Sequence, residues 1–311
     1  MLSSPHLLMM DNLNAHDIEA IMGAAQSFEE INQRAIKKLP TLRGRTVINL
    51  FLEPSTRTRT SFEIAAKRLG ADAINMTAAA SSTVKGESLQ DTAQTLNAMN
   101  CDLVVVRHKY AGAPGLLAQN MDSHIINGGD GIHQHPTQTL LDIYTMQKHF
   151  GSLAGKTVGI VGDIVHSRVA GSLAPALTQH GAQVIFIAPP AYLPSKPELL
   201  GAQCVSHLDA CIQDLDVLYL LRIQKERADG ASIPSAREYS RLYGFDARRA
   251  EKLNKNALVM HPGPMNRGIE IAGDVVGDER VKVLDQVNAG VAVRMALMYL
   301  MLGGEEHGLT A

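Results

Sequence analysis

The stretch Asn49-Leu50-Phe51-Leu52-Glu53-Pro54-Ser55-Thr56-Arg57-Thr58-Arg59-Thr60-Ser61-Phe62-Glu63 decides the fold. An apolar run, Val47 to Leu52, ends at Glu53-Pro54 and is followed by hydroxyls, arginines and then apolar residues at helical spacing. Proline fits at or just before a first helical turn, because its missing N–H has no helical partner there. The stretch therefore predicts a strand that leads into the N-terminus of a helix.

A helix start of this kind is a candidate anion site. Its first backbone N–H groups have no helical partner, and the helix dipole adds a partial positive charge. Ser55, Thr56, Thr58 and Arg57 add donors, and a guanidinium can bind a phosphate through two parallel bonds. The alternative is an N-cap followed by a solvated basic face, although a cap needs only one such side chain. Arg57 and Arg59 point about 200° apart on a helix, so we expect one to bind ligand and the other to be structural.

Composition indicates a soluble, globular chain. The 311 residues suggest roughly two domains, and 45% hydrophobic with 19% charged residues is ordinary for such proteins. A formal net charge of −2 gives no electrostatic case for binding nucleic acid or a membrane. Three cysteines without a C-x-x-C pair favour neither a disulfide framework nor a zinc site. The first ten residues do not resemble a signal peptide, so we expect a cytoplasmic protein.

Alternating strand and helix patterns predict two doubly wound α/β domains with parallel sheets, and an active site in the crevice between them. We expect domains over 1–150 and 151–287, followed by a helix and tail, 288–311, with the helix packing back on the first domain. The spacing also predicts a helix over 17–38 and a loop over 228–240.

Arginines fall where predicted strands end or helices begin. Arg107 closes the strand 102–108, Arg168 starts the helix after 155–163, and Arg222 follows the strand 216–221. Parallel sheets bind ligands at these carboxyl ends, so the crevice should be cationic and suit small polyanions. A salt bridge at the rim of the sheet is the alternative for Arg107.

His135-Pro136-Thr137-Gln138 opens another predicted helix. A histidine there can donate to a developing oxyanion, and a glutamine can read an amide. A metal site at His133 and His135 is disfavoured, since no third ligand has a suitable spacing. A dinucleotide site after 155–163 is disfavoured because the G-x-G-x-x-G pattern is missing. In the loop 81–88, Lys85 could bind an anion, but the loop pattern alone favours a solvated segment.

These motifs resemble the aspartate/ornithine carbamoyltransferase family. FLEPSTRTRTS at 51–61 is similar to its phosphate signature, and HPTQ at 135–138 to its second motif. The segments 105–108, 221–227 and 261–264 resemble the branch whose acceptor is aspartate, since the ornithine branch carries Cys in place of Pro262. The resemblance covers nearly the whole chain.

The resemblance implies carbamoyl transfer from carbamoyl phosphate to L-aspartate, the committed step of pyrimidine synthesis, without a cofactor or metal. Arg57, Thr58, Arg107 and His135 would be catalytic. Carbamoyl phosphate would be held by Ser55, Thr56, Arg57, Thr58, Arg107, His135, Gln138 and main-chain carbonyls near Pro262 and Gly263. Aspartate would be held by Lys85, Arg168, Arg222 and Gln224. Ser81 and Lys85 would come from a neighbouring subunit of a homotrimer.

Three further expectations concern partners and rival functions. We expect Glu53 and Glu226 to orient arginines across the domains, and a surface role is the alternative for Glu226. Met265-Asn266-Arg267-Gly268 resembles forms that associate with a dihydroorotase or dihydroorotase-like chain. The rival functions are transfer to ornithine or another amine, a nicotinamide-dependent dehydrogenase, and a non-catalytic anion-binding module.

Overall fold

The structure, a computed structural model, describes residues 2–77, 87–223 and 235–303. The chain forms two compact units, Met1–Tyr144 with Val287–Ala311, and Thr145–Gln286. It leaves the first unit within α5 (Pro136–Phe150) and returns within α9 (Val283–Met301). Among the described helices, none has the length and apolar character needed to cross a membrane.

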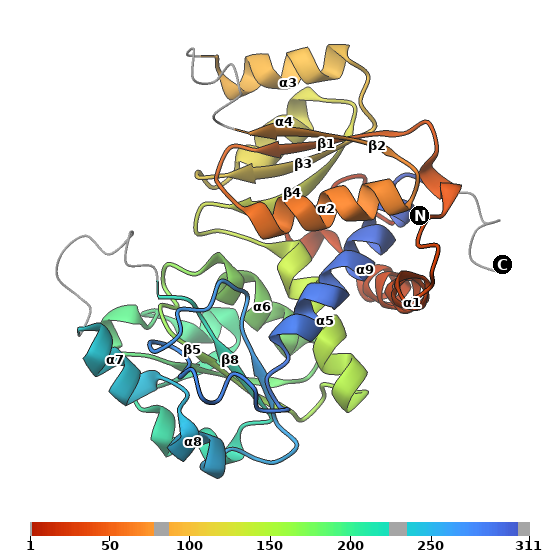
Figure 1. The fold of residues 1–311 in the computed structure, drawn as a ribbon. Coiled ribbons are helices and arrows are strands. Elements are labelled where there is room, and N and C mark those ends of the chain that lie inside the picture. Colours follow the sequence, from red (N-terminus) through yellow and green to blue (C-terminus); the bar gives the residue numbers. More distant parts are fainter. Residues whose placement is uncertain (1, 78–86, 224–234, 304–311) are drawn as a thin grey trace. The chain divides into compact units, whose positions relative to one another are not determined.

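The first unit is a parallel sheet with the strand order β2-β1-β3-β4. Figure 1 shows α3 and α4 on one side of this sheet and α2 on the other. Alternate residues of β1 and β3, such as Leu50 and Val106, pack against Leu96 of α3 and Leu117 of α4. The strands are β1 (Thr46–Phe51), β2 (Asp72–Thr77), β3 (Leu103–His108) and β4 (His124–Asp130), and the helices α1 (Ala15–Asn32), α2 (Thr56–Arg68), α3 (Leu89–Ala98) and α4 (Ala113–Asn120).

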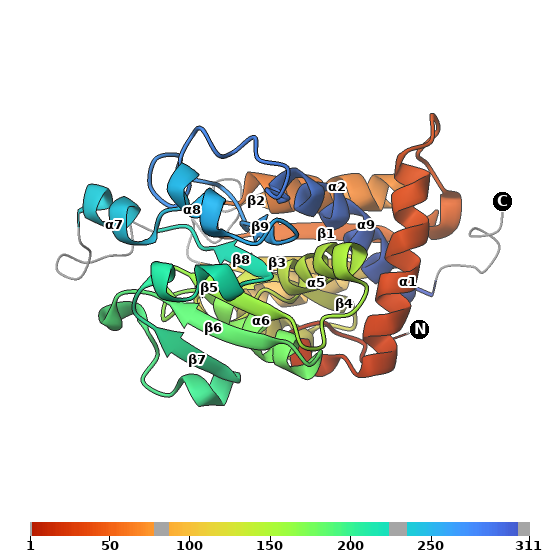
Figure 2. The same cartoon turned by 90° about the horizontal axis from the view of Figure 1, so that it is seen from below.

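The second unit is a parallel sheet with the order β7-β6-β5-β8-β9, and Figure 2 shows β5, β6 and β7 side by side. Its core joins Leu218 and Val259 of the sheet to Tyr239 and Tyr243 of α7. The strands are β5 (Thr157–Val161), β6 (Gln183–Ile187), β7 (Ala202–Val205), β8 (Val217–Leu220) and β9 (Leu258–Met260), and the helices α6 (Arg168–Gln179), α7 (Ala236–Tyr243) and α8 (Ala247–Lys252).

Short 3-10 helices occur in both units. In the first unit they cover Met10–Asn12 and Pro40–Leu42, and in the second Pro190–Tyr192, Pro197–Leu200, Leu208–Ala210 and Ile212–Asp214.

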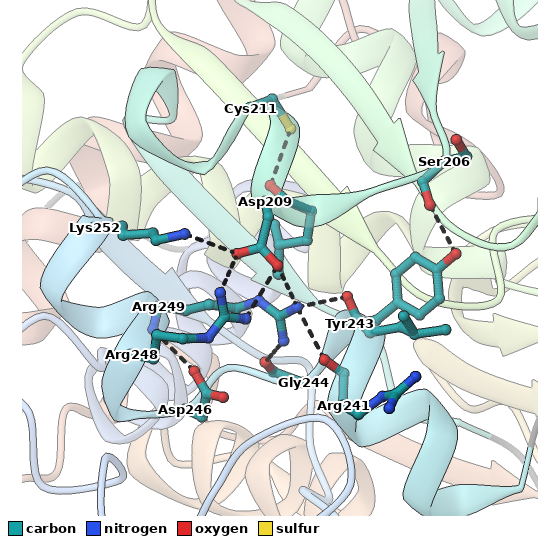
Figure 3. A network of polar contacts seen from close by, with 12 residues as sticks. Ser206, Asp209, Cys211, Arg241, Tyr243, Gly244, Asp246, Arg248, Arg249 and Lys252 are labelled. Atoms are coloured by element: carbon teal, nitrogen blue, oxygen red, sulfur yellow. Dashed lines mark hydrogen bonds and ion pairs between the residues drawn. The ribbon is translucent and has the colours of Figure 1, made fainter.

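A polar network in the second unit ties α7 to α8 (Figure 3). The Arg249 side chain is 1% exposed, donates to the carbonyls of Gly244 and Leu242, and pairs with Asp209 at 2.8 Å. These carbonyls lie at the C-terminal end of α7, where helical acceptors lack partners, and a cation is favoured there. The network therefore fixes the end of α7 against the rest of its unit.

The predicted fold class, two parallel-sheet α/β domains, is confirmed. Two segment predictions were wrong in part. Of the predicted loop 228–240, residues 228–234 lie outside the described residues, and from Ala236 the chain forms α7, because the Ser235 side chain accepts from the Glu238 N–H and caps the helix. The helix over 17–38 ends at Asn32, and Ile36 beyond it is 79% exposed, so continuing the helix would bury little there.

Candidate active site

The strand order of the first unit brings two predicted segments together. After β1 the chain goes to β2 on one side and then to β3 on the other, so the order reverses between β1 and β3. Parallel α/β sheets bind ligands at such a switch point, beyond the carboxyl ends of the strands. Phe51 pairs with Arg107 across the two strands, and the Leu52 N–H donates to the Arg107 carbonyl at 2.8 Å. The α2 start and Arg107 therefore share one end of the sheet.

The start of α2 does not use the Ser55 hydroxyl as a helix cap. Ser55 is the N-cap residue, but its side chain makes no capping hydrogen bond, and the first turn contains no acidic residue. Thr56 and Arg57 are exposed, while Ser55 and Thr58 are half-buried. Ser55 therefore does not cap α2 through its side chain, and the exposed basic face stays open to either interpretation. The arrangement suits an anion at the helix N-terminus.

Arg107 is held by three neighbours in the first unit. Its Nε lies 3.0 Å from Glu53 Oε2, its Nη1 donates to the Gly128 carbonyl at 3.0 Å, and Nη1 lies 3.5 Å from His135 Nε2. The arginine and glutamate side chains are only 11% and 16% exposed. Glu53 therefore orients Arg107 within one unit, and its expected pairing with arginines across the domains stays a prediction. The salt bridge that was the alternative for Arg107 is therefore present, and a ligand role for the same side chain stays a prediction.

His135 and Gln138 lie at the start of α5 and are both buried. The Gln138 Nε2 donates to Asp142 Oδ1 at 3.0 Å, one helical turn later. This bond uses one of the two N–H groups and turns the nitrogen end of the amide toward Asp142, so the oxygen is the end suited to accept from a ligand N–H. An acceptor there fits an amide-reading role.

Asp130 organises the loop before His135, although it was not among the site residues predicted from the sequence. It is 1% exposed and accepts from the Gly112 N–H at 2.8 Å, the Gln134 N–H at 3.1 Å and the His133 ring at 3.1 Å. The signal was an aspartate inside a glycine turn at a strand end. Within the described residues, no group of three or more His, Cys, Asp or Glu could hold a metal ion.

Arg294 of α9 supports α2 from within the same unit, although no sequence pattern singles it out. Its Nη1 donates to Ser61 Oγ at 2.9 Å, and its guanidinium lies 4.9 Å from the centre of the Phe62 ring. Complete burial lowers the pKa of Arg294 to about 10, opposed by the nearby Asp142. The side chain therefore stays charged at neutral pH and anchors the helix whose start is the candidate anion site.

The second unit repeats the switch-point geometry between β5 and β8. The Leu221 N–H donates to the Val161 carbonyl at 2.8 Å, so Arg222 lies next to the end of β5. Arg168 is the first residue of α6 and is 9% exposed. Two arginines thus gather at one end of this sheet, which suits a ligand with carboxylates.

The turn after β9 adjoins this end, since Tyr219 of β8 pairs with Met260. Pro262 and Gly263 are half-buried there, between buried His261 and the residues that follow. The Gly263 N–H donates to His261 Nδ1 at 2.8 Å. The predicted residues Ser81, Lys85, Gln224 and Glu226 lie outside the described residues.

Comparisons with known proteins agree along the whole chain. Residues 5–148 match the model of the aspartate/ornithine carbamoyltransferase carbamoyl-P binding domain, and residues 154–301 that of the Asp/Orn binding domain. The chain is 51% identical over 301 residues to the aspartate carbamoyltransferase catalytic subunit of Syntrophotalea carbinolica, covering 97% of this chain and 96% of the relative. It is 52% identical over 304 residues to that of Acidothermus cellulolyticus, covering 98% and 94%.

Solved structures are similar too. Aspartate transcarbamoylase from Trypanosoma cruzi in complex with N-(phosphonacetyl)-L-aspartic acid has a TM-score of 0.85 and 32% identity, with 94% of each chain covered. The catalytic subunit of the M. jannaschii enzyme has a TM-score of 0.83 and 36% identity, with 96% and 98% covered.

Proposed function

The chain belongs to the aspartate/ornithine carbamoyltransferase family, and from this premise we infer that it transfers the carbamoyl group of carbamoyl phosphate to L-aspartate. The products are N-carbamoyl-L-aspartate and phosphate, and in the family this is the committed step of pyrimidine synthesis. One observation carries the conclusion: about half of the residues are identical, over nearly the full length, to aspartate carbamoyltransferase catalytic subunits.

The first unit would bind carbamoyl phosphate. Ser55, Thr56, Arg57 and Thr58 would hold the phosphate, supported by the uncapped start of α2. Thr58, Arg107 and His135 would donate to the carbonyl oxygen, where negative charge builds up as the amine attacks. The acceptor end of Gln138, with carbonyls near Pro262 and Gly263, would read the carbamoyl amide.

The second unit would bind aspartate through Arg168 and Arg222, joined by Gln224 and Lys85. Because each substrate is an anion, the arginines would also neutralise their mutual repulsion. No side-chain nucleophile is needed, since the amine of aspartate attacks the carbonyl carbon and phosphate leaves. The role of the chain is to hold both substrates and to stabilise the charge that forms.

The assembly and location extend this proposal. Ser81 and Lys85 would enter the site of a neighbouring subunit in a homotrimer. The sequence after the Pro-Gly-Pro turn supports a dihydroorotase or dihydroorotase-like partner chain. We also propose a cytoplasmic location.

Phosphate release tests the function directly. We expect release with carbamoyl phosphate and L-aspartate together, and only background release when ornithine replaces aspartate. Product analysis should find N-carbamoyl-L-aspartate in an amount equal to the phosphate. If phosphate is released with carbamoyl phosphate and ornithine but not with aspartate, the chain belongs to the ornithine branch. If carbamoyl phosphate binds but no phosphate is released with either amine, the non-catalytic anion-binding module is favoured.

A further inference from the structure

We propose that Glu270 and His261 are positioning residues for the turn after β9. Glu270 fixes the tautomer of the His261 ring, and the ring sets the direction of the Pro262 carbonyl. This inference deepens the proposed function and rests on it, because that carbonyl is one that we assign to the carbamoyl amide. All three residues belong to the second unit.

The first contact defines which ring nitrogen carries hydrogen. The Gly263 N–H lies 2.8 Å from His261 Nδ1. A backbone N–H can only donate, so Nδ1 accepts and carries no proton. The proton of the neutral imidazole is then on Nε2.

The second contact stabilises that tautomer. His261 Nε2 lies 3.2 Å from Glu270 Oε1, and both side chains are 1% exposed, so water does not compete for the proton. The same oxygen accepts from the Asn266 N–H at 2.6 Å. A carboxyl group behind a histidine is a common way to fix both the tautomer and the ring orientation.

The other carboxyl oxygen argues for a role beyond packing. Glu270 Oε2 is buried and has no hydrogen-bond partner within the described part of the chain. A buried polar atom without a partner destabilises the fold, so a position selected for stability alone would favour an apolar side chain.

Peptide geometry carries the effect from the ring to the substrate. The Pro262 carbonyl and the Gly263 N–H belong to one planar peptide group and point in opposite directions. Fixing the N–H on the His261 ring therefore directs the carbonyl away from the ring. The His261 backbone is itself held, because its N–H donates to Gln286 Oε1 at 3.0 Å.

Comparing the affinities for two acyl phosphates distinguishes a misplaced Pro262 carbonyl from general damage to the fold. Acetyl phosphate has a methyl group where carbamoyl phosphate has its amine, and it keeps the phosphate and the carbonyl oxygen. Only the amine can donate to the Pro262 carbonyl. The ratio of the two affinities therefore reports on this carbonyl, and each affinity is measured by competition in the phosphate-release assay or by calorimetry.

Four variants test whether Glu270 and His261 position the Pro262 carbonyl. Glu270→Ala and His261→Gln should lower the affinity for carbamoyl phosphate about tenfold, the loss of one hydrogen bond, with the affinity for acetyl phosphate unchanged. His261→Asn should stay near wild type, because its side-chain oxygen can accept from the N–H two residues on. Glu270→Gln keeps an acceptor oxygen and should also preserve the ratio. His261→Gln supplies the test if Glu270→Ala does not fold.

The inference is overturned if both acyl phosphates lose affinity equally, or if neither does, in the folded Glu270→Ala or His261→Gln protein. Asp209→Asn is the matched control, since it removes a charged partner elsewhere in the same unit and should leave the ratio unchanged. Failure of the proposed function is a separate result, because it shows in the wild-type protein as no product from carbamoyl phosphate and aspartate, and it would overturn this inference as well.

Discussion

Single side chains in the first unit connect strand ends that lie far apart in the sequence. Arg107 of β3 contacts Glu53 after β1, Gly128 of β4 and, more loosely, His135 before α5. Each contact restricts the guanidinium, so it is already oriented before any ligand arrives. A donor that is oriented in advance stabilises developing charge without reorganising during the reaction. Arg57, by contrast, is exposed at the start of α2.

Arg57→Ala tests the phosphate site, with Arg59→Ala as its matched control. The two changes remove the same charge from the same helix, but at positions about 200° apart around its axis. We expect Arg57→Ala to lower kcat on the order of 10²–10³-fold, as for loss of a donor to developing charge, and Arg59→Ala to have a far smaller effect. Steady-state kinetics and circular dichroism check activity and folding. Near-normal turnover in the Arg57 variant would remove it from the site.

At the scale of helices and strands, the sequence predicts most of the elements that carry the candidate site residues. The runs ending at Leu52 and Arg107 are apolar and β-branched, so their pattern predicts buried parallel strands. The α8 helix has no comparable signal, because its stability comes from the buried Arg249 and its distant partners, and α4 is similarly weak in pattern. A salt bridge was foreseen for Arg107 and an arginine partner for Glu53, but that the two pair with each other depends on strand order rather than on spacing.

Asp209→Asn tests the network that joins α7 and α8 (Figure 3). Burial alone would raise the pKa of Asp209, but hydrogen bonds from Arg248 and Arg249 outweigh it and hold the pKa below the ordinary 3.8. A lowered pKa in the folded state means that the carboxylate stabilises the fold above about pH 4 and that this stabilisation is lost as the pH falls further. The variant should therefore unfold at a lower temperature than wild type at pH 7.

The difference between wild type and Asp209→Asn should shrink below about pH 4, because protonation removes the same charge from the wild-type protein. Thermal unfolding followed by circular dichroism over a pH series measures it. Asp214→Asn, an exposed aspartate nearby, should change the midpoint little. A difference that stays constant from pH 7 to pH 3 would argue against the charge of Asp209 as its cause.

At the scale of the whole chain, the two units share one geometry, and the proposed function gives each a different ligand. Each sheet places arginines at the point where its strand order reverses, Arg107 in one unit and Arg222 in the other. The formal net charge of the chain is −2, so attraction of anionic substrates must come from these local clusters. Composition and periodicity carry no signal for subunit number, which is why the trimer comes from the family resemblance alone.

Mixing two inactive variants tests the shared site of the proposed trimer. Arg57→Ala damages the phosphate site of its own subunit, whereas Lys85→Ala removes the residue that we assign to the neighbour's site. In a ring of three, every mixed trimer contains one interface where both residues are wild type, so random exchange should restore about one quarter of wild-type activity. Exchange is verified by native mass spectrometry. A protein carrying both substitutions, mixed with Arg57→Ala, should stay inactive, because no interface then has both residues. Verified exchange without recovery of activity would place each complete site within one chain.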